Sequence, residues 1–270
     1  MSGLQLIGLK KTFLKGTPNE KKALDNISLQ VEQGEFITLL GSNGAGKSTL
    51  FNAILGKFGL DKGKILLDGE DITKMKDYRR ALNIGCLYQD PLRGTAPNMT
   101  IEENLALAYT RKANPSFFAV NRRDSAYFRD LLKSLDLGLE DRLKTKMGLL
   151  SGGQRQAASL LMATIAEPRL LLLDEHTAAL DPATAEKVMQ LTKRIVSEQK
   201  LTCLIITHNM VSALETGNRT VLMDDGRIVL DVSGPERESL TVPKLLEQFR
   251  LKSGKDLDND RILLSGAGAN

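Results

Sequence analysis

The chain has 270 residues, and its 41% hydrophobic and 26% charged residues are typical of an ordinary soluble globular protein. Its formal net charge of only +4, with basic and acidic residues interleaved, argues against a nucleic-acid-binding surface. No apolar run is long enough to cross a bilayer, and the two cysteines, Cys86 and Cys203, have neither metal-binding nor disulfide spacing. Both cysteines lie on strands that we expect to be buried, which fits a reducing compartment, and residues 1–11 lack the apolar core of a secretory signal.

The N-terminal part predicts an antiparallel β layer. Alternating hydrophobic residues indicate three strands, at residues 4–10, 27–31 and 64–67. Phe13 follows the first strand, and residues 15–20 lengthen the loop of this hairpin.

A buried strand at residues 35–40 leads into a glycine-rich loop and a helix at residues 48–55. The loop fills every required position of the phosphate-binding template GxxxxGK[ST], with Gly41, Ser42, Asn43, Gly44, Ala45, Gly46, Lys47, Ser48 and Thr49. Its backbone amides can turn inward as an anion nest, and the helix N-terminus adds partial positive charge. We therefore expect a nucleotide whose β- and γ-phosphates contact Lys47, with Mg²⁺ bound in part by Ser48. The alternative is a glycine turn that happens to precede a lysine.

From residue 90 to residue 149 the hydrophobic spacing and the capping patterns predict helices. Thr100 and Glu103 form a capping-box pattern, and residues 121–135 have the spacing of a second helix. Ser151 and Gln154 form another capping box, opening a helix that reaches about Ala166. Gly152 and Gly153, in its first turn, expose backbone amides that favour an anion. A second anion-binding helix end suggests a nucleotide clamped between two copies of the protein, whereas the alternative is an ordinary capped helix.

An apolar strand at residues 170–173 ends in two carboxylates. Ligands of open α/β sheets bind beyond the carboxyl ends of the strands. Asp174 can therefore orient Mg²⁺ or its waters, and Glu175 can align and polarise an attacking water, unless the pair is merely a solvated strand end.

The C-terminal third continues the alternation of helices and strands. Asp181 and Pro182 form an N-cap and first-turn pair for a helix reaching about Gln199. His208 follows a strand expected at residues 201–206. A closing hairpin, a further helix and a loosely held polar tail are expected at residues 221–232, 240–251 and 254–270.

In this order the motifs resemble the ATP-binding subunit of a bacterial ABC transporter, and the resemblance covers residues 4–232. It implies an α/β fold with a RecA-like P-loop NTPase core, an antiparallel β subdomain and an inserted α-helical subdomain. The implied ATPase domain covers residues 1–240, with core parts at 1–89 and 160–235 and the helical subdomain at about 90–159. Residues 241–270 would be a C-terminal helix and tail.

The resemblance also implies roles for single residues. Phe13 would stack on adenine, and Gln89 would sense Mg²⁺ and the attacking water. Ser151, Gly152, Gly153 and Gln154 resemble the signature that contacts the γ-phosphate bound to the opposite subunit. Asp181 would lie across the dimer interface, and His208 would touch the γ-phosphate. The alternatives are a core aromatic for Phe13, an ordinary loop residue for Gln89 and a polar surface residue for His208.

The chain departs from the family pattern at three places. His176 stands where proline usually follows the catalytic glutamate, so it either tunes the site electrostatically or is a tolerated loop variant. The arginine frequent near the end of the signature helix is absent. The long loop at residues 15–20 could also shift the adenine contact from Phe13 to a neighbour.

The implied function is ATP hydrolysis in a homodimer that sandwiches ATP and Mg²⁺, with Glu175, His208, Lys47 and Gln89 as catalytic residues. It would power import of a small solute, such as an amino acid, through an integral membrane permease at the cytoplasmic face of the membrane. The variant at Glu175 and His176 resembles cassettes that are paired with solute-binding proteins for aromatic amino acids. An exporter or envelope-protein ATPase, and a soluble non-transport ATPase, remain as alternatives, although the chain shows neither a second cassette nor a long coiled-coil insertion.

Overall fold

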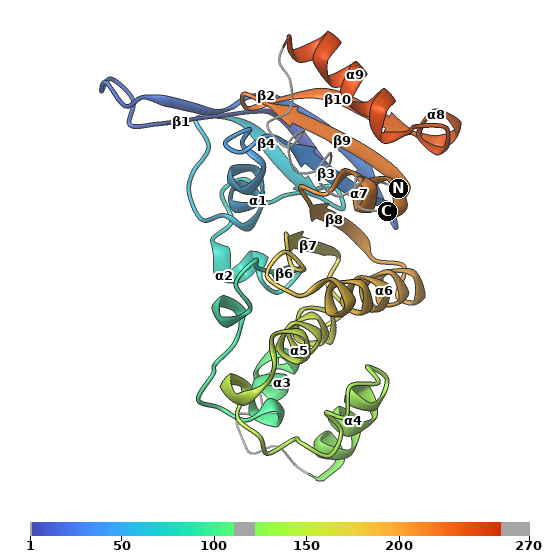
Figure 1. The fold of residues 1–270 in the computed structure, drawn as a ribbon. Coiled ribbons are helices and arrows are strands. Elements are labelled where there is room, and N and C mark those ends of the chain that lie inside the picture. The colour runs from blue at the N-terminus through green and yellow to red at the C-terminus, as the bar shows by residue number, and fades with distance from the viewer. Residues whose placement is uncertain (1, 111–121, 255–270) are drawn as a thin grey trace. The chain divides into compact units, whose positions relative to one another are not determined.

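The structure is a computed structural model that describes residues 2–110 and 122–254 (Figure 1). The polar tail expected after Gly254 lies outside the described residues. The chain divides into two compact units, one formed by residues 1–80 and 202–270 and the other by residues 81–201. None of the helices in the described ranges combines the length and apolarity that a membrane span requires.

The first unit contains the predicted antiparallel β layer, with the strand order β2-β1-β4-β5. The strands are β1 (Ser2–Phe13), β2 (Lys21–Glu32), β4 (Lys62–Leu67) and β5 (Glu70–Asp71). Ile27, Leu29 and Val31 of β2 are buried, and the residues between them are exposed. This alternation gives the sheet one packed face and one solvated face.

The same unit contains four further strands in the order β10-β9-β3-β8. They are β3 (Phe36–Gly41), β8 (Thr202–Ile206), β9 (Arg219–Asp224) and β10 (Arg227–Ser233). β3 is parallel to both β8 and β9, and every residue of β3 and β8 is buried, as expected for central parallel strands. β9 and β10 form the predicted closing hairpin.

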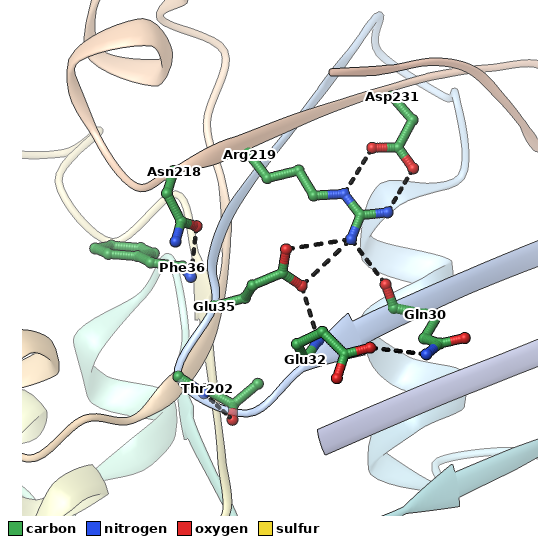
Figure 2. A network of polar contacts seen from close by, with 9 residues as sticks. Gln30, Glu32, Glu35, Phe36, Thr202, Asn218, Arg219 and Asp231 are labelled. Atoms are coloured by element: carbon green, nitrogen blue, oxygen red, sulfur yellow. Dashed lines mark hydrogen bonds and ion pairs between the residues drawn. The ribbon is translucent and has the colours of Figure 1, made fainter. Parts of the chain in front are cut away.

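Arg219, at the start of β9, connects strands of both sheets in this unit (Figure 2). Its guanidinium donates two hydrogen bonds of 2.7 Å to Asp231 of β10, and its Nη1 donates to the carbonyl of Gln30 in β2 at 2.8 Å. Glu35, just before β3, lies 3.2 Å from the same nitrogen. The hydrogen bonds with Asp231 raise the pKa of Arg219, so the group stays charged. The bidentate ion pair with Asp231 connects β9 to β10 within one sheet, and the hydrogen bond to the Gln30 carbonyl connects β9 to the other sheet.

Short helices complete the first unit. They are α1 (Lys47–Leu55), α2 (Asp77–Arg80), α7 (Met210–Glu215), α8 (Gly234–Glu238) and α9 (Val242–Ser253). The predicted C-terminal helix is confirmed as α9, whose Leu245 and Phe249 pack in a cluster with Met210 and Leu230. This packing makes the C-terminal helix an integral part of the unit.

Buried Arg237 satisfies the backbone at the end of α7. It donates to the carbonyls of Ala213, Leu214 and Thr216 and to the hydroxyl of Thr220, at distances of 2.7 to 3.2 Å. Burial lowers the pKa of Arg237 from its ordinary value. The last carbonyls of a helix have no partner within the helix, so this side chain supplies the missing donors.

We expect Arg237→Met to lower the free energy of unfolding by about 2–4 kcal/mol, because it removes charge-assisted hydrogen bonds and leaves buried carbonyls without donors. The measurement is the urea midpoint of the purified chain. Arg79→Met is the control, since Arg79 is an exposed arginine of the same unit. Equal midpoints for the two variants would contradict the assigned role of Arg237.

In the described part of the chain, the second unit holds a pair of parallel strands, four α-helices and two short 3₁₀ helices. β6 (Ile84–Leu87) pairs with β7 (Leu170–Asp174). The helices are α3 (Ile101–Tyr109), α4 (Arg122–Lys133), α5 (Gly152–Thr164) and α6 (Pro182–Glu198), with short 3₁₀ helices η1 (Pro91–Gly94) and η2 (Met147–Leu149). α5 is the central helix of the unit, because it contacts α3, α4, α6 and β6, and every residue from Gln156 to Thr164 is buried.

The expected element types are confirmed here, with small shifts of the boundaries. α5 ends at Thr164 instead of about Ala166, and α4 begins at Arg122, one residue after the expected start, which lies outside the described residues. The expectation that both cysteines are buried is wrong for Cys86, which is half-buried, whereas Cys203 is buried. Among the described residues of its unit, β6 pairs only with β7, and the open side of this strand explains the exposure of Cys86.

Candidate active site

The glycine-rich loop connects β3 to α1 in the first unit. The amide of Ala45 donates to the carbonyl of Ser42 at 3.2 Å, and the carbonyl of Ala45 accepts from the amide of Gly226 at 3.0 Å. Gly46 is the N-cap of α1 with a φ of +102°, and a Cβ on this residue would lie 2.5 Å from the carbonyl oxygen of Ala23. Only glycine fits this close approach in a left-handed conformation, so the loop shape depends on Gly46.

Lys47 is held against this loop. Its side chain is buried, and its ammonium donates to the carbonyls of Gly41 at 2.7 Å and Ser42 at 3.0 Å. These contacts keep a cation beside the glycine-rich loop at the N-terminus of α1, which is an arrangement suited to the oxygens of a polyphosphate. Ser48, in the first turn of α1, is exposed.

Two residues beside the loop were missed in the sequence. Ser42 Oγ donates to the buried carboxylate of Asp224 at 3.3 Å. A Cβ placed on Gly44 would lie 3.5 Å from Lys21 Nζ, so the Lys21 side chain lies beside the phosphate loop. The sequence carries no specific signal for Lys21, because a lysine is common on solvated surfaces; in the structure it pairs with Phe13 in the register of β1 and β2.

Phe13 belongs to an aromatic pair at the end of β1. Its ring meets the ring of Phe58 edge-on, with centroids 5.2 Å apart, and the Lys11 ammonium lies 5.3 Å from both centroids. The Phe13 side chain is half-buried. The contact of Phe58 with Phe13 could not be predicted from the sequence, since Phe58 lies outside any recognised motif.

His208 lies at the same edge of the parallel strands as the phosphate loop. It follows β8, which is the direct neighbour of β3, and it is exposed. Asn209, next to it, caps α7 by accepting from the amide of Ser212 at 3.0 Å. The carboxyl ends of adjacent parallel strands meet at one edge, so the fold places His208 on the side of the loop.

In the second unit, the ends of β6 and β7 bring Gln89 and Glu175 together. Gln89 Nε2 donates to Glu175 Oε2 at 3.4 Å, a long hydrogen bond between side chains that are 86 positions apart. Asp174 is the last residue of β7, and it is half-buried. Glu175 has a φ of +44°, in the left-handed region that residues with side chains seldom adopt.

The N-terminus of α5 has the predicted capping box. The amide of Gln154 donates to Ser151 Oγ, and the amide of Ser151 donates to Gln154 Oε1, both at 3.3 Å. Ser151 and Gly152 are exposed, but Gly153 is buried, because a Cβ there would lie 2.2 Å from Thr184 Cγ2 of α6. The absence of a side chain at Gly153 therefore permits the close packing of α5 on α6.

Asp181 is the N-cap of α6, as its sequence predicts. Its carboxylate accepts from the amide of Thr184 at 3.1 Å, and Pro182 takes the first helical position. The hydrogen bonds from Thr184 lower the pKa of Asp181. The N-cap Asp181 and Pro182 in the first turn thus explain why α6 begins here.

His176 points into its own unit. It is 2% exposed, and its Nε2 lies 3.0 Å from Thr192 Oγ1 of α6. Burial lowers the pKa of His176 from 6.5 to about 4, so the ring is neutral at pH 7. It therefore adds no charge beside Glu175, in contrast to the electrostatic alternative.

The donor chemistry suits Mg²⁺ bound together with a phosphate ligand. In residues 2–110 and 122–254, no cluster of three or more His, Cys, Asp or Glu side chains could hold a metal by itself. The expected ligands Ser48, Gln89 and Asp174 all offer oxygen atoms, which Mg²⁺ prefers, and Mg²⁺ usually takes its remaining ligands from water and phosphate. In each unit, the oxygen-bearing side chains present are of the type that Mg²⁺ prefers.

Comparisons with known proteins agree with these features. Residues 24–178 match the family model described as ABC transporter. The chain is 42% identical over 246 residues to a tyrosine transport ATP-binding protein of Clostridioides difficile, covering 91% of this chain and 98% of that protein. It is 33% identical to a phosphonates import ATP-binding protein of Lactococcus lactis subsp. cremoris, over 88% of this chain and 96% of that protein. The solved dimer of the ATP-binding cassette MJ0796 with ADP and Pi matches with a TM-score of 0.73 and 30% identity, covering 85% of this chain and 98% of the other.

Proposed function

This chain belongs to the family of ABC transporter ATP-binding subunits, and from that premise we propose that it powers import of an aromatic amino acid through a partner permease. Membership makes it an ATPase of a transporter with the P-loop NTPase fold. The observation that carries the finer proposal is the 42% identity to a tyrosine transport ATP-binding protein over 91% of this chain.

We propose that two copies sandwich two ATP molecules. In each half-site the loop amides and Lys47 would bind the phosphates, and Phe13 would stack on adenine. Ser151, Gly152, Gly153 and Gln154 of the opposite copy would face the γ-phosphate, with Asp181 at the interface. Support comes from the two separate anion-favouring helix ends, at α1 and α5, and from the dimeric cassette among the similar structures.

In the hydrolysis step Glu175 would align the attacking water, with Gln89 hydrogen-bonded to its carboxylate and His208 beside the γ-phosphate. Ser48, Asp174 and Gln89 would hold Mg²⁺, which neutralises charge on the phosphate oxygens when it is bound. The protein's contribution is positioning, since phosphoryl transfer requires little covalent chemistry from its side chains.

We infer that the chain is peripheral to the membrane, at the cytoplasmic face, bound to a permease that works with an extracellular solute-binding protein. The names of the similar proteins support transport, and several of them state import.

The test is uptake of radiolabelled tyrosine by cells that lack this chain. We expect the wild-type gene to restore uptake and Glu175→Gln to fail, with a phosphonate and spermidine as comparison solutes, since similar proteins are named for them. Normal tyrosine uptake without the chain, with loss of another solute, would overturn the solute class. Increased tyrosine accumulation without the chain would instead indicate export.

A further inference from the structure

The turn that carries Glu175 is strained and needs support from its surroundings. Glu175 has a φ of +44°, in the left-handed region that residues with side chains avoid. The turn after it contains two local hydrogen bonds, from Ala178 to the carbonyl of Glu175 at 3.0 Å and from Leu180 to that of Thr177 at 3.2 Å. Such a conformation persists only where neighbouring contacts hold it.

One such contact is the hydrogen bond between His176 and Thr192. Thr192 lies within α6, is 0% exposed, and donates its single hydroxyl proton to the carbonyl of Val188 at 2.8 Å. With that proton donated to Val188, the Thr192 oxygen is left to accept from His176 Nε2, 3.0 Å away, and we assign the imidazole proton to Nε2 on this network. The chain of donors is His176 to Thr192 to Val188.

The other nitrogen of this ring has no hydrogen-bond partner. His176 Nδ1 is buried and unpartnered among the described residues. A buried acceptor without a donor is unfavourable, and an apolar side chain would avoid this cost. The compensating contact is the one made by Nε2, which connects the turn to α6.

We propose that His176 is a positioning residue, which holds the Glu175 turn on α6 through Thr192 and keeps the Glu175 carboxylate within reach of Gln89. The proposal rests on the proposed role of Glu175 in aligning water. A proline at position 176 would restrict the backbone of the preceding residue through its ring. Histidine imposes no such restriction, so in this chain the restraint comes from the side-chain hydrogen bond.

The chain offers a matched pair of threonines for the test. Thr164 of α5 is also 0% exposed, and its hydroxyl donates to the carbonyl of Leu160, four positions earlier, at 3.0 Å. Unlike Thr192, it is not hydrogen-bonded to His176. Thr192→Val and Thr164→Val therefore remove the same hydroxyl from a buried position of a helix, and only the first also removes the acceptor for His176.

Two variants test the histidine itself. His176→Phe keeps an aromatic ring at this position but has no N–H to donate to Thr192. His176→Gln keeps an N–H at a similar distance from the Cβ and should restore the hydrogen bond.

We expect Thr192→Val and His176→Phe to lower kcat for MgATP about tenfold in the purified full chain, with KM within about twofold, because a misplaced carboxylate impairs chemistry more than binding. His176→Gln should retain kcat within about threefold of wild type, and Thr164→Val should match wild type. Melting temperatures measured in parallel identify any variant that does not fold, and the kcat values of the folded variants then test the positioning role.

The proposal is overturned if folded His176→Phe or Thr192→Val has wild-type kcat, if His176→Gln is as impaired as His176→Phe, or if Thr164→Val is as impaired as Thr192→Val. Glu175→Gln in the same assay separates this proposal from the proposed function. Normal turnover by Glu175→Gln would remove Glu175 as the water-aligning residue. An inactive Glu175→Gln beside fully active His176 and Thr192 variants would refute only the positioning role.

Discussion

Glu175→Gln is expected to reduce kcat for MgATP by about 10³-fold while ATP affinity stays within about twofold of wild type. The amide has nearly the shape of the carboxylate but cannot accept a proton or polarise water as an anion does. In the proposed site, ATP binds at the phosphate loop of the first unit, whereas Glu175 belongs to the second. Phosphate release by the purified chain measures kcat, and equilibrium titration with ATP measures affinity.

Glu186→Gln is the control for this experiment, because Glu186 is an exposed carboxylate of α6 that accepts a hydrogen bond from Gln190 Nε2 at 3.2 Å. We expect wild-type turnover from it. The Glu175 variant should also accumulate as a dimer with MgATP in solution scattering, since bound ATP is no longer consumed. Wild-type turnover by Glu175→Gln would refute the assignment of the base, and a persistent monomer would refute the sandwiched dimer.

The second large effect is expected for Lys47→Ala, which should weaken ATP binding by about 30- to 100-fold. Its ammonium is buried and lies 2.7 Å from the carbonyl of Gly41 and 3.0 Å from that of Ser42. Removing it leaves these carbonyls without their donor and removes a charge-assisted contact to phosphate, worth roughly 1.5–3 kcal/mol. Isothermal titration with ATP measures the change.

Lys57→Ala serves as the matched control, since Lys57 follows α1 and its exposed ammonium pairs with Asp77 at 3.5 Å. Its ATP affinity should equal that of the wild type. An unchanged affinity in Lys47→Ala, with Lys57→Ala also unchanged, would mean that the loop binds phosphate without this cation.

Features set by neighbouring residues could be predicted from the sequence. The capping boxes at Thr100 and Ser151 and the cap at Asp181 use partners three positions away, so short patterns specify them. The phosphate loop is also local, because its glycines and the following helix are contiguous. The closing hairpin depended on an adjacent turn signal in the same way.

Contacts between distant residues could not be predicted. The hydrogen bond from His176 to Thr192, the position of Lys21 beside Gly44 and the capping of α7 by Arg237 all depend on how separate elements pack. No periodicity or motif encodes such pairings in one sequence. The same limit applies to Cys86, whose half-burial depends on which neighbours β6 receives in the sheet.

The two threonines on the inner side of α6 have a mechanical consequence. Thr184 packs against Gly153 of α5, and Thr192 accepts a hydrogen bond from His176. The single helix α6 therefore connects the start of α5 to the turn that carries Glu175. Each residue of a helix advances by about 1.5 Å and rotates by about 100°, so the helix fixes the distance and the angle between these two threonines. A force that shifts α6 would therefore reach Gly153 and the turn of Glu175, the proposed water-aligning residue, at the same time.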